Sequence, residues 1–131
     1  MQGDKFHAGQ TFLIDIPNRD KKHLFIIVLE PEKVTGRAIF VPVDSHNYDG
    51  CPTVELHAGD HEFITKQSYV TFKFARVEAV AWLEDWIKQG KAKPMGSISE
   101  EILQKIYEKL SFSHIVKNEV LEFFSSQTWK I

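Results

Sequence analysis

Imidazole, carboxylate and cationic side chains recur where this sequence predicts strand ends and turns. Histidine transfers protons near neutral pH, and Lys or Arg stabilises the negative charge of a phosphate. Residues on loops and strand ends can converge at one mouth of a barrel. The pattern therefore suits acid–base cleavage of a phosphodiester bond. The groups concerned are Lys22, His23, Asp44, Ser45, His46, His57, Asp60, His61 and Arg76.

Cleavage of RNA without a metal needs three groups. A base takes the proton of the 2′-hydroxyl, an acid protonates the leaving 5′ oxygen, and a donor stabilises the charged phosphorane. We expect Lys22 or Arg76 to hold the phosphate, and His23 and His61 to exchange protons. Asp44 is another candidate base. Because side chains of these types suffice, no cofactor is expected.

Each candidate also has an ordinary structural explanation. Lys22 lies in a charged cluster that is typical of a solvated loop, and Asp44 with Ser45 can form the turn that closes a strand. A buried His61, hydrogen-bonded to backbone, is as good an interpretation as a catalytic one. Arg76 lies on a predicted strand and could form an ion pair at an interface or at the edge of the core.

A metal site is a second interpretation of the turn around Asp60. His57, Asp60 and His61 offer three potential ligands within five residues, and His46 and Asp49 lie nearby in the sequence. Zinc or manganese accepts such ligands, so a metal-dependent hydrolase is an alternative. The spacing lacks the helical His-Glu-X-X-His pattern, and a glycine followed by Asp60 is also typical of a tight turn.

The composition predicts one intracellular domain. The chain has 131 residues, the usual size of one domain, and 43% are hydrophobic, enough to form a core. The single cysteine, Cys51, allows no internal disulfide and favours a reducing compartment. The N-terminus lacks the apolar core of a signal peptide, and the longest apolar run, Leu24–Leu29, is too short to span a bilayer. We therefore expect a cytoplasmic protein without membrane association.

The charge balance limits how the chain could bind nucleic acid. Its net charge is −2 and its pI is about 6.3. Proteins that bind nucleic acid through a positive electrostatic field over much of their surface are usually basic. Binding would therefore need a local basic patch. A non-catalytic barrel that binds a protein or nucleic-acid partner is a further alternative.

Hydrophobic periodicity predicts β-strands through the first two-thirds of the chain. Gln10–Ile16 alternates apolar and polar residues, and Leu24–Leu29 is the continuous apolar run of a central strand. Arg37–Val43 and Thr53–His57 are two further strands. Ser68–Trp82, rich in Val, Tyr, Phe and Thr, is either one long bent strand or two.

The last third has helical spacing. Ser97 or Ser99 can cap a helix with one apolar stripe, formed by Ile98, Ile102, Leu103, Ile106 and Leu110. Ser113 can cap a last helix whose apolar face contains Val116, Val120, Phe123 and Phe124. Glu84–Gly90 is predicted to form a short helix that ends at its glycine. Short strands followed by helices predict an α+β fold, with a small curled β-barrel before C-terminal helices.

Five segments, in order along the chain, resemble one known family. They are His-Ala-Gly-Gln-Thr-Phe-Leu-Ile-Asp-Ile at 7–16, Lys-His-Leu-Phe-Ile-Ile-Val-Leu at 22–29, Ala-Ile-Phe-Val-Pro-Val-Asp-Ser at 38–45, Ser-Tyr-Val at 68–70 followed by Ala75 and Arg76, and Met-Gly-Ser-Ile-Ser-Glu-Glu-Ile-Leu at 95–103. This succession is similar to the MazF/PemK toxin endoribonucleases. The resemblance implies an SH3-like barrel followed by helices, and metal-independent cleavage of single-stranded RNA.

The resemblance also implies where the active site lies. In the family, an arginine of an Arg-Pro pair and a threonine of a Pro-Ile-Thr-Ser motif are thought to carry the cut. Lys22-His23 stands at the first position, Asp44 replaces that threonine, and Ser45 is retained. These two strand ends are then expected to face each other across one cleft.

Further residues are expected around that cleft. His61 and Arg76 are expected to approach it from the other side. Asp49 is expected to lie outside the site, so that its replacement by alanine leaves activity intact. Residues expected to bind RNA are Arg19, Lys21, His46, Ser68 and Arg76.

The resemblance finally implies two protein partners, a cognate antitoxin and a second copy of the chain. A homodimer would also use apolar residues in excess of one small core, such as Trp82, Trp86 and Trp129. The polar loop Pro17–His23 is expected to be a mobile flap that becomes ordered on RNA or on an antitoxin segment.

Overall fold

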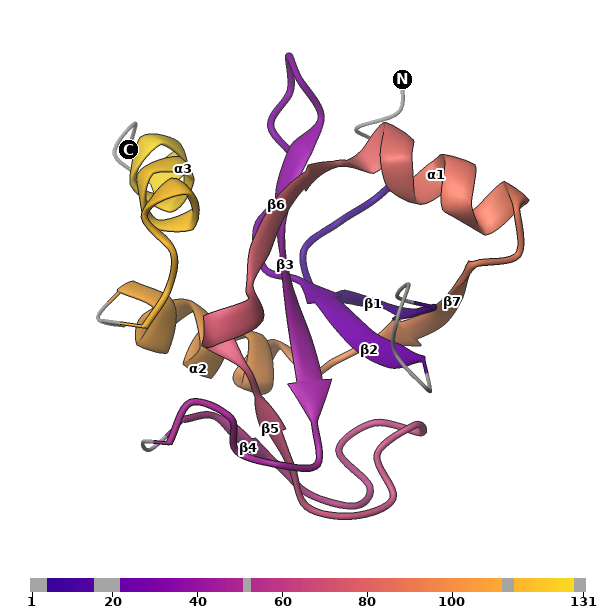
Figure 1. Ribbon diagram of the computed structural model, residues 1–131, viewed down its shortest axis with the longest axis vertical. Helices are drawn as coiled ribbons and strands as arrows, with labels where there is room; N and C mark the ends of the chain where they lie inside the picture. Colours follow the sequence, from indigo (N-terminus) through magenta and orange to yellow (C-terminus); the bar gives the residue numbers. More distant parts are fainter. Residues whose placement is uncertain (1–4, 16–21, 51–52, 112–114, 129–131) are drawn as a thin grey trace.

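The computed structural model describes residues 5–15, 22–50, 53–111 and 115–128 (Figure 1). Its strands are β1 (Gln10–Ile14), β2 (His23–Ile27), β3 (Arg37–Asp44), β4 (Glu55–Leu56), β5 (Ser68–Val70), β6 (Arg76–Ala79) and β7 (Ala92–Ser97). Its α-helices are α1 (Val80–Lys88), α2 (Glu100–Ser111) and α3 (Asn118–Thr128), and a 3₁₀ turn, η2, spans Phe72–Phe74. The predicted α+β class, a barrel-like sheet before mainly C-terminal helices, is confirmed.

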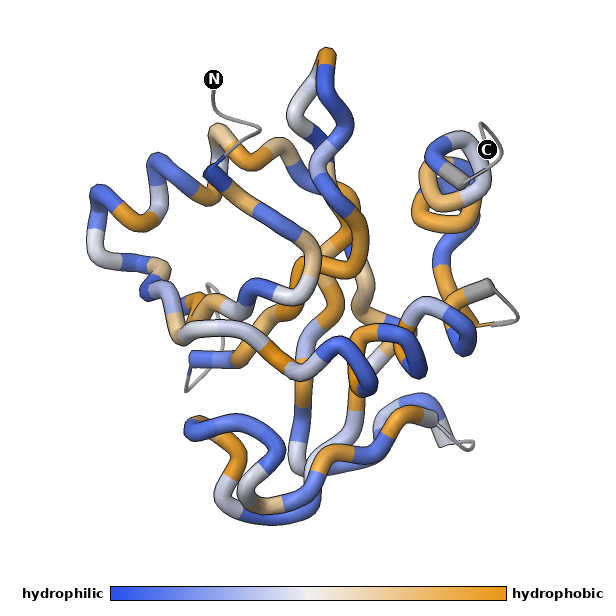
Figure 2. Tube along the Cα trace, turned by 180° about the vertical axis from the view of Figure 1, so that it is seen from behind, coloured by the Kyte–Doolittle hydropathy of each residue, from blue (hydrophilic) through white to orange (hydrophobic). Residues whose placement is uncertain are grey.

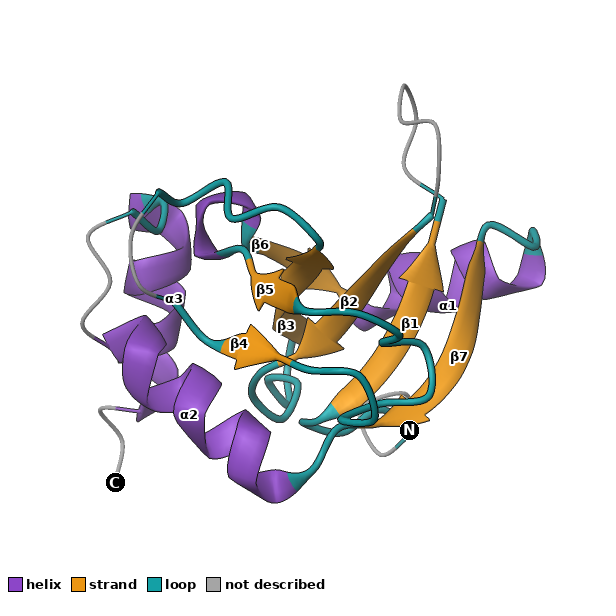
Figure 3. Cartoon of the chain, turned by 90° about the horizontal axis from the view of Figure 1, so that it is seen from below, coloured by secondary structure: helices purple, strands orange, loops and turns teal. Residues whose placement is uncertain are grey.

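The long strand β3 organises the sheet. The described strands form one antiparallel seven-stranded sheet in the order β4-β5-β3-β2-β1-β7, and β6 joins it through β3. One edge of β3 pairs with β2, while the other edge pairs with β6 along its first half and with β5 at its end. Because two short strands share that edge, the sheet bends between them and curls (Figure 3).

Two hydrophobic cores lie on opposite faces of this sheet. Leu24 and Ile26 of β2 belong to the core under α2 and α3, and Phe25 and Ile27 to the core under α1. Along the chain, short hydrophobic segments alternate with hydrophilic ones (Figure 2). Because both faces of β2 are covered, its sequence is a continuous apolar run, as the sequence predicted for a central strand.

The segment predicted as one or two strands at Ser68–Trp82 contains more than two elements. β5 and β6 are separated by η2, and the chain enters α1 at Val80, so Trp82 is helical. Helix α1 therefore begins earlier than the predicted Glu84, although Gly90 ends it as expected, with a φ of 78°.

Sequence reasoning missed β7, which contains Pro94 and Gly96. The strand lies at the edge of the sheet, where a proline costs no ladder hydrogen bond on its open side. Since Ser97 ends β7, the cap of α2 is Ser99, whose Oγ accepts the N–H of Ile102 at 3.2 Å. The other predicted cap, Ser113, lies outside the described residues.

Candidate functional site

His23 and Asp44 meet where β2 begins and β3 ends. They lie on adjacent antiparallel strands, one position beyond the paired residues Leu24 and Val43. Nδ1 of His23 is 3.0 Å from Oδ1 of Asp44, and the two side chains are only 11% and 6% exposed. A buried carboxylate at this distance fixes the orientation of the imidazole ring. The two strand ends, which were expected to face each other across one cleft, are therefore in direct contact through these side chains.

Thr71 completes this pair and was missed from the sequence. Its hydroxyl donates a hydrogen bond of 2.8 Å to Oδ2 of Asp44, and its side chain is buried. Both carboxylate oxygens are thus engaged, one by Thr71 and the other by the ring of His23. The available signal was a threonine inside the apolar run Val70-Thr71-Phe72, since a buried hydroxyl needs a polar partner.

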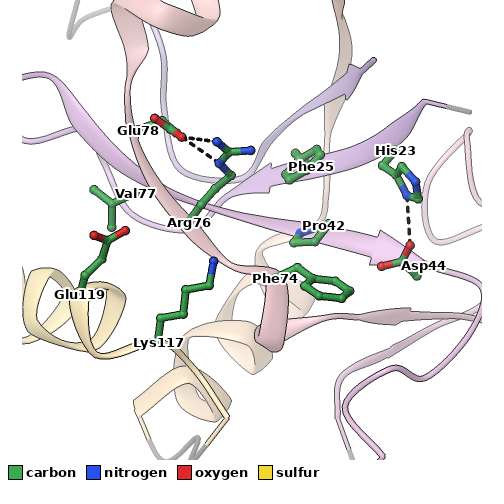
Figure 4. A pocket seen from close by; sticks show the side chains of 10 residues that line it. All are labelled: His23, Phe25, Pro42, Asp44, Phe74, Arg76, Val77, Glu78, Lys117 and Glu119. Carbon is green, nitrogen blue, oxygen red and sulfur yellow. Dashed lines mark hydrogen bonds and ion pairs between the residues drawn. The ribbon is translucent and has the colours of Figure 1, made fainter. Parts of the chain in front are cut away.

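A cleft of about 350 Å³, here named the Arg76 cleft, opens on one side of the pair (Figure 4). Its lining residues are His23, Phe25, Pro42, Asp44, Phe74, Arg76, Val77, Glu78, Lys117 and Glu119. The guanidinium of Arg76 is paired with Glu78 and lies over the ring of Trp82 at 5.4 Å. Lys117, just before α3, extends into the cleft between Arg76 and Phe74, and no described residue forms an ion pair or hydrogen bond with its ammonium group.

A larger cleft of about 660 Å³, here named the Lys22 cleft, opens on the other side of the pair. Its residues come from the ends of β2, β3 and β5, from the loop after β3 and from the loop before β5. They are Lys22, His23, Leu24, Val43, Asp44, Ser45, His46, Tyr48, Glu62, Phe63, Ile64, Thr65, Lys66 and Ser68. Lys22, Ser45, His46 and Ser68 therefore lie with His23 and Asp44, as expected from the sequence.

His23 and Asp44 form the wall that the two clefts share. Nδ1 of His23 faces Asp44, and among the described residues none forms a hydrogen bond or ion pair with its Nε2. Cationic side chains line both clefts, with Lys22 and Lys66 on one side and Arg76 and Lys117 on the other. Carboxylates line them as well, Glu62 on one side and Glu78 and Glu119 on the other. The ring of His23 can exchange a proton with a group bound in either cleft.

The expectation that His61 faces the same cleft is wrong. His61 is buried, and its Nδ1 accepts the backbone N–H of Phe63 at 3.0 Å. Nε2 therefore carries the proton and donates to the carbonyl of Met95 at 2.7 Å, beside the hydroxyl of Thr11. Both ring nitrogens are occupied, and His61 lines neither cleft. His61 is therefore the buried, hydrogen-bonded histidine that the sequence offered as an alternative to a catalytic one. It fixes the loop before β5 to the edge of the sheet formed by β1 and β7.

The other turn residues also have structural roles. Oδ2 of Asp60 accepts the backbone N–H of His57 at 2.7 Å, which closes a tight turn. Among the described residues, no group of three or more His, Cys, Asp or Glu side chains could hold a metal ion. Asp49 lines neither cleft, as expected, but its carboxylate accepts the N–H groups of Phe72 and Lys73 at 3.0 and 3.1 Å and so holds η2.

Some expectations fall outside the described residues. Arg19 and Lys21 lie there, as does the predicted flap Pro17–His23 except for its last two residues, and so does Trp129. Trp82 and Trp86 pack partly against the core under α1 and against each other, with ring centroids 4.6 Å apart. In the described part of the chain, every helix is too short or too polar to cross a membrane.

Comparison with solved structures identifies the fold. Two crystal structures of MazE–MazF from Deinococcus radiodurans, Form-III and Form-II, match with TM-scores of 0.51 and 0.52 at 20% sequence identity. Each match covers 81% of this chain, and 92% and 91% of the matched chains. A crystal structure of MazF from the same organism, Form-I, matches with a TM-score of 0.51 at 18% identity, over 80% of this chain and 91% of the other.

No protein-family model matches the sequence, and a search of curated proteins finds no similar sequence. The likeness therefore lies in the fold, which is MazF-like, as the sequence resemblance implied. Because a shared fold at 18–20% sequence identity does not establish a shared activity, the function has to be argued from the residues of the two clefts.

Proposed function

We propose that this chain is the toxin of a toxin–antitoxin pair and a metal-independent endoribonuclease that cuts single-stranded RNA. One observation carries the proposal: the His23–Asp44 pair forms the wall between two clefts that each contain cationic side chains. A phosphodiester beside Nε2 of His23 would have cations on both sides. The MazF-like fold supports the same activity.

His23 is the principal proton carrier in this proposal. Asp44 holds the ring through Nδ1, which leaves Nε2 to exchange a proton with the substrate. Asp44 itself is a poor base, because its oxygens already contact His23 and Thr71. The second carrier is His46, the other imidazole that lines the Lys22 cleft.

The reaction is an internal transfer of the phosphodiester. One imidazole takes the proton of the 2′-hydroxyl, and the 2′ oxygen forms a new bond to phosphorus. The bond to the 5′ oxygen breaks, and the other imidazole, in its protonated form, gives that oxygen its proton. The products are a 2′,3′-cyclic phosphate and a 5′-hydroxyl, so the reaction consumes no water and needs no oxidant.

Cations at the clefts stabilise the phosphorane. Lys22 lines one cleft, and Arg76 and Lys117 line the other. A phosphate would compete with Glu78 for Arg76, since the two are already paired. Lys117 forms no ion pair with a described residue, although Glu119 lines the same cleft, and it is the cation most readily available to the phosphate.

Two protein partners belong to the proposal. Two of the matched crystal structures are of MazE–MazF, in which MazF is assembled with MazE. We extend this arrangement to the present chain, with an antitoxin protein as its partner. We also propose that the chain forms a homodimer.

The test is cleavage of a defined RNA oligonucleotide by purified protein in EDTA, with mapping of the new ends. We expect a 2′,3′-cyclic phosphate and a 5′-hydroxyl. His23→Ala should lower the rate on the order of 10² to 10⁴-fold without unfolding the protein. His57→Ala, an exposed histidine that lines neither cleft, is the matched control and should cut at the wild-type rate.

Other outcomes select the alternatives. Cleavage that EDTA abolishes and that zinc or manganese restores would favour a metal-dependent hydrolase. Absence of cleavage, together with harmless expression in cells, would favour a barrel that only binds its partner. A His23→Ala protein that cuts at the wild-type rate would remove His23 from the mechanism.

A further inference from the structure

The Lys22 cleft exposes two aromatic rings that the proposed chemistry does not use. Among the described residues, the only exposed large hydrophobic side chains are Val34, Tyr48 and Phe63. Tyr48 is 43% exposed and Phe63 is 41% exposed, and both line the Lys22 cleft with His23 and Asp44. Packing in the hydrophobic core does not explain aromatic rings that are exposed beside a polar cleft, and such rings often mark a binding site.

Tyr48 belongs to a short aromatic row that joins the two clefts. Its ring lies 4.6 Å from His46 in an edge-on arrangement and 5.7 Å from Phe74 in a tilted one. His46 lines the Lys22 cleft and Phe74 lines the Arg76 cleft. Neighbouring rings thus fix Tyr48 in position while nearly half of it stays in contact with solvent.

Phe63 belongs to the loop that His61 fixes. Its backbone N–H donates to Nδ1 of the buried His61, so the residue is held although its side chain is exposed. No ring of the described residues packs against Phe63. The ring is therefore available to a flat ligand, and the loop that holds it loses little entropy on binding.

Cations surround the aromatic row. Lys22 and Lys66 line the same cleft, and the ammonium group of Lys73 lies 5.9 Å from the centroid of the Phe74 ring. The loop before β5, which lines the Lys22 cleft, also carries one acidic side chain, Glu62. Solvent-exposed rings among cations are the combination by which proteins bind single-stranded nucleic acid, because bases stack on rings while cations follow the phosphates.

We infer that Tyr48 and Phe63 form a base-stacking subsite for single-stranded RNA, in which unpaired bases next to the phosphate at His23 lie on the two rings. The inference rests on the proposed function and deepens it, since it selects unpaired RNA over duplex. Bases inside a duplex are stacked on one another and cannot reach these rings. The row His46–Tyr48–Phe74 would let a strand pass from one cleft to the other.

Binding can be measured without cleavage. The probe is a fluorescein-labelled 2′-O-methyl RNA dodecamer, whose blocked 2′ oxygen cannot attack phosphorus, with fluorescence anisotropy as the readout. A dodecamer of the same phosphates with abasic sites, and the dodecamer annealed to its complement, are the comparison ligands. The abasic probe keeps the charge and removes the stacking.

We expect Tyr48→Ala and Phe63→Ala each to weaken Kd for the single strand about tenfold, within the range for loss of one base–aromatic stack. Kd for the abasic probe should stay the same. Tyr48→Phe and Phe63→Tyr keep a ring and should bind within about twofold of wild type. Val34→Ala, which removes an exposed apolar side chain between β2 and β3, is the matched control and should change nothing.

Three results would overturn the subsite: unchanged affinity in both alanine variants, an equal loss for the abasic probe, or displacement by polyglutamate as effective as by the unlabelled dodecamer. The last would indicate an acidic peptide as the ligand. Failure of the proposed function is a separate result, because ring-dependent binding with no cleavage by wild type would leave the subsite in place. Cleavage by wild type together with binding that does not depend on the rings would support the proposed function and exclude the stacking subsite.

Discussion

The hydroxyl of Thr71 donates a hydrogen bond of 2.8 Å to Oδ2 of Asp44, the carboxylate whose other oxygen faces the ring of His23. The hydroxyl and the carboxylate are both buried, so water cannot easily replace either partner. Thr71 follows β5, Asp44 ends β3 and His23 begins β2. Three strands of the curled sheet therefore fix the orientation of one imidazole.

Thr71→Val should separate this positioning role from packing, because valine keeps the shape and removes the hydroxyl. We expect a loss of stability of about 1–3 kcal/mol, since one oxygen of a buried carboxylate loses its donor. The cleavage rate constant should fall about tenfold with KM little changed, as expected when proton transfer is misaligned. Thr71→Ser should restore both. Equal cleavage by Thr71→Val and wild type would show that the hydroxyl does not position His23.

His61→Ala should act on stability before it acts on chemistry. The substitution removes the acceptor for Phe63 N–H and the donor to the Met95 carbonyl, so we expect a loss of about 1–3 kcal/mol in urea unfolding. The maximal rate of the folded protein should change little, and KM should rise as the cleft wall loosens. A folded His61→Ala protein with wild-type stability and no cleavage would instead indicate that His61 takes part in catalysis.

Asp49→Ala should also destabilise the protein, although Asp49 lines neither cleft. Its carboxylate caps η2 through the backbone N–H groups of Phe72 and Lys73, so its loss leaves both donors without their partner. We expect about 0.5–2 kcal/mol, the usual value for a lost cap. Thermal unfolding is the measurement, and Asp49→Asn, which keeps one acceptor oxygen, should lose less. A melting temperature identical to wild type would contradict this role.

Lys117→Ala should weaken cleavage if this lysine contacts the phosphate. We expect kcat/KM to fall about tenfold and its salt dependence to become shallower, because one phosphate-neutralising cation is gone. Lys105→Ala is the matched control, since Lys105 is exposed on α2 and lines neither cleft. An equal effect of the two variants would indicate that only the total charge matters.

The dimer is tested by mass in solution. Multi-angle light scattering at micromolar concentration should give twice the mass of the 15.1 kDa chain. The tryptophans give this expectation little support, because Trp82 and Trp86 are partly covered by their own core. A monomer mass across that concentration range would be incompatible with the proposal.

Local patterns in the sequence were sufficient for most of the fold. Strand β2 was predictable because a strand covered on both faces must be apolar throughout, as Leu24–Ile27 is. The apolar stripe of α2 was predictable because a helix on one core repeats its buried residues every three or four positions, as Ile102, Ile106 and Leu110 do. By contrast, β7 forms by pairing with β1, which is distant in the sequence. Its Pro94 and Gly96 have low intrinsic preference for a strand, so the local sequence does not predict it.

The sequence by itself also determined which residues could carry chemistry, since residue type sets which side chains can exchange protons or hold a phosphate. The family resemblance of the sequence implied that the strand ends with His23 and Asp44 face each other. Only the tertiary structure decided between His23 and His61. The two imidazoles have the same intrinsic chemistry, but both nitrogens of His61 are satisfied, Nδ1 by the nearby N–H of Phe63 and Nε2 by the distant Met95 carbonyl. His23 instead lines two clefts.

Thr71, Lys117 and the exposed rings of Tyr48 and Phe63 depend on the tertiary structure in the same way. A threonine in an apolar run, a lysine before a helix and single aromatic residues in polar loops are ordinary in sequence. They acquire their significance from pairings between β2, β3 and β5 and from the packing of α3 beside β6. Distances between residues far apart in the chain are set by how sheet and helices bury their apolar faces together, and local pattern does not encode them.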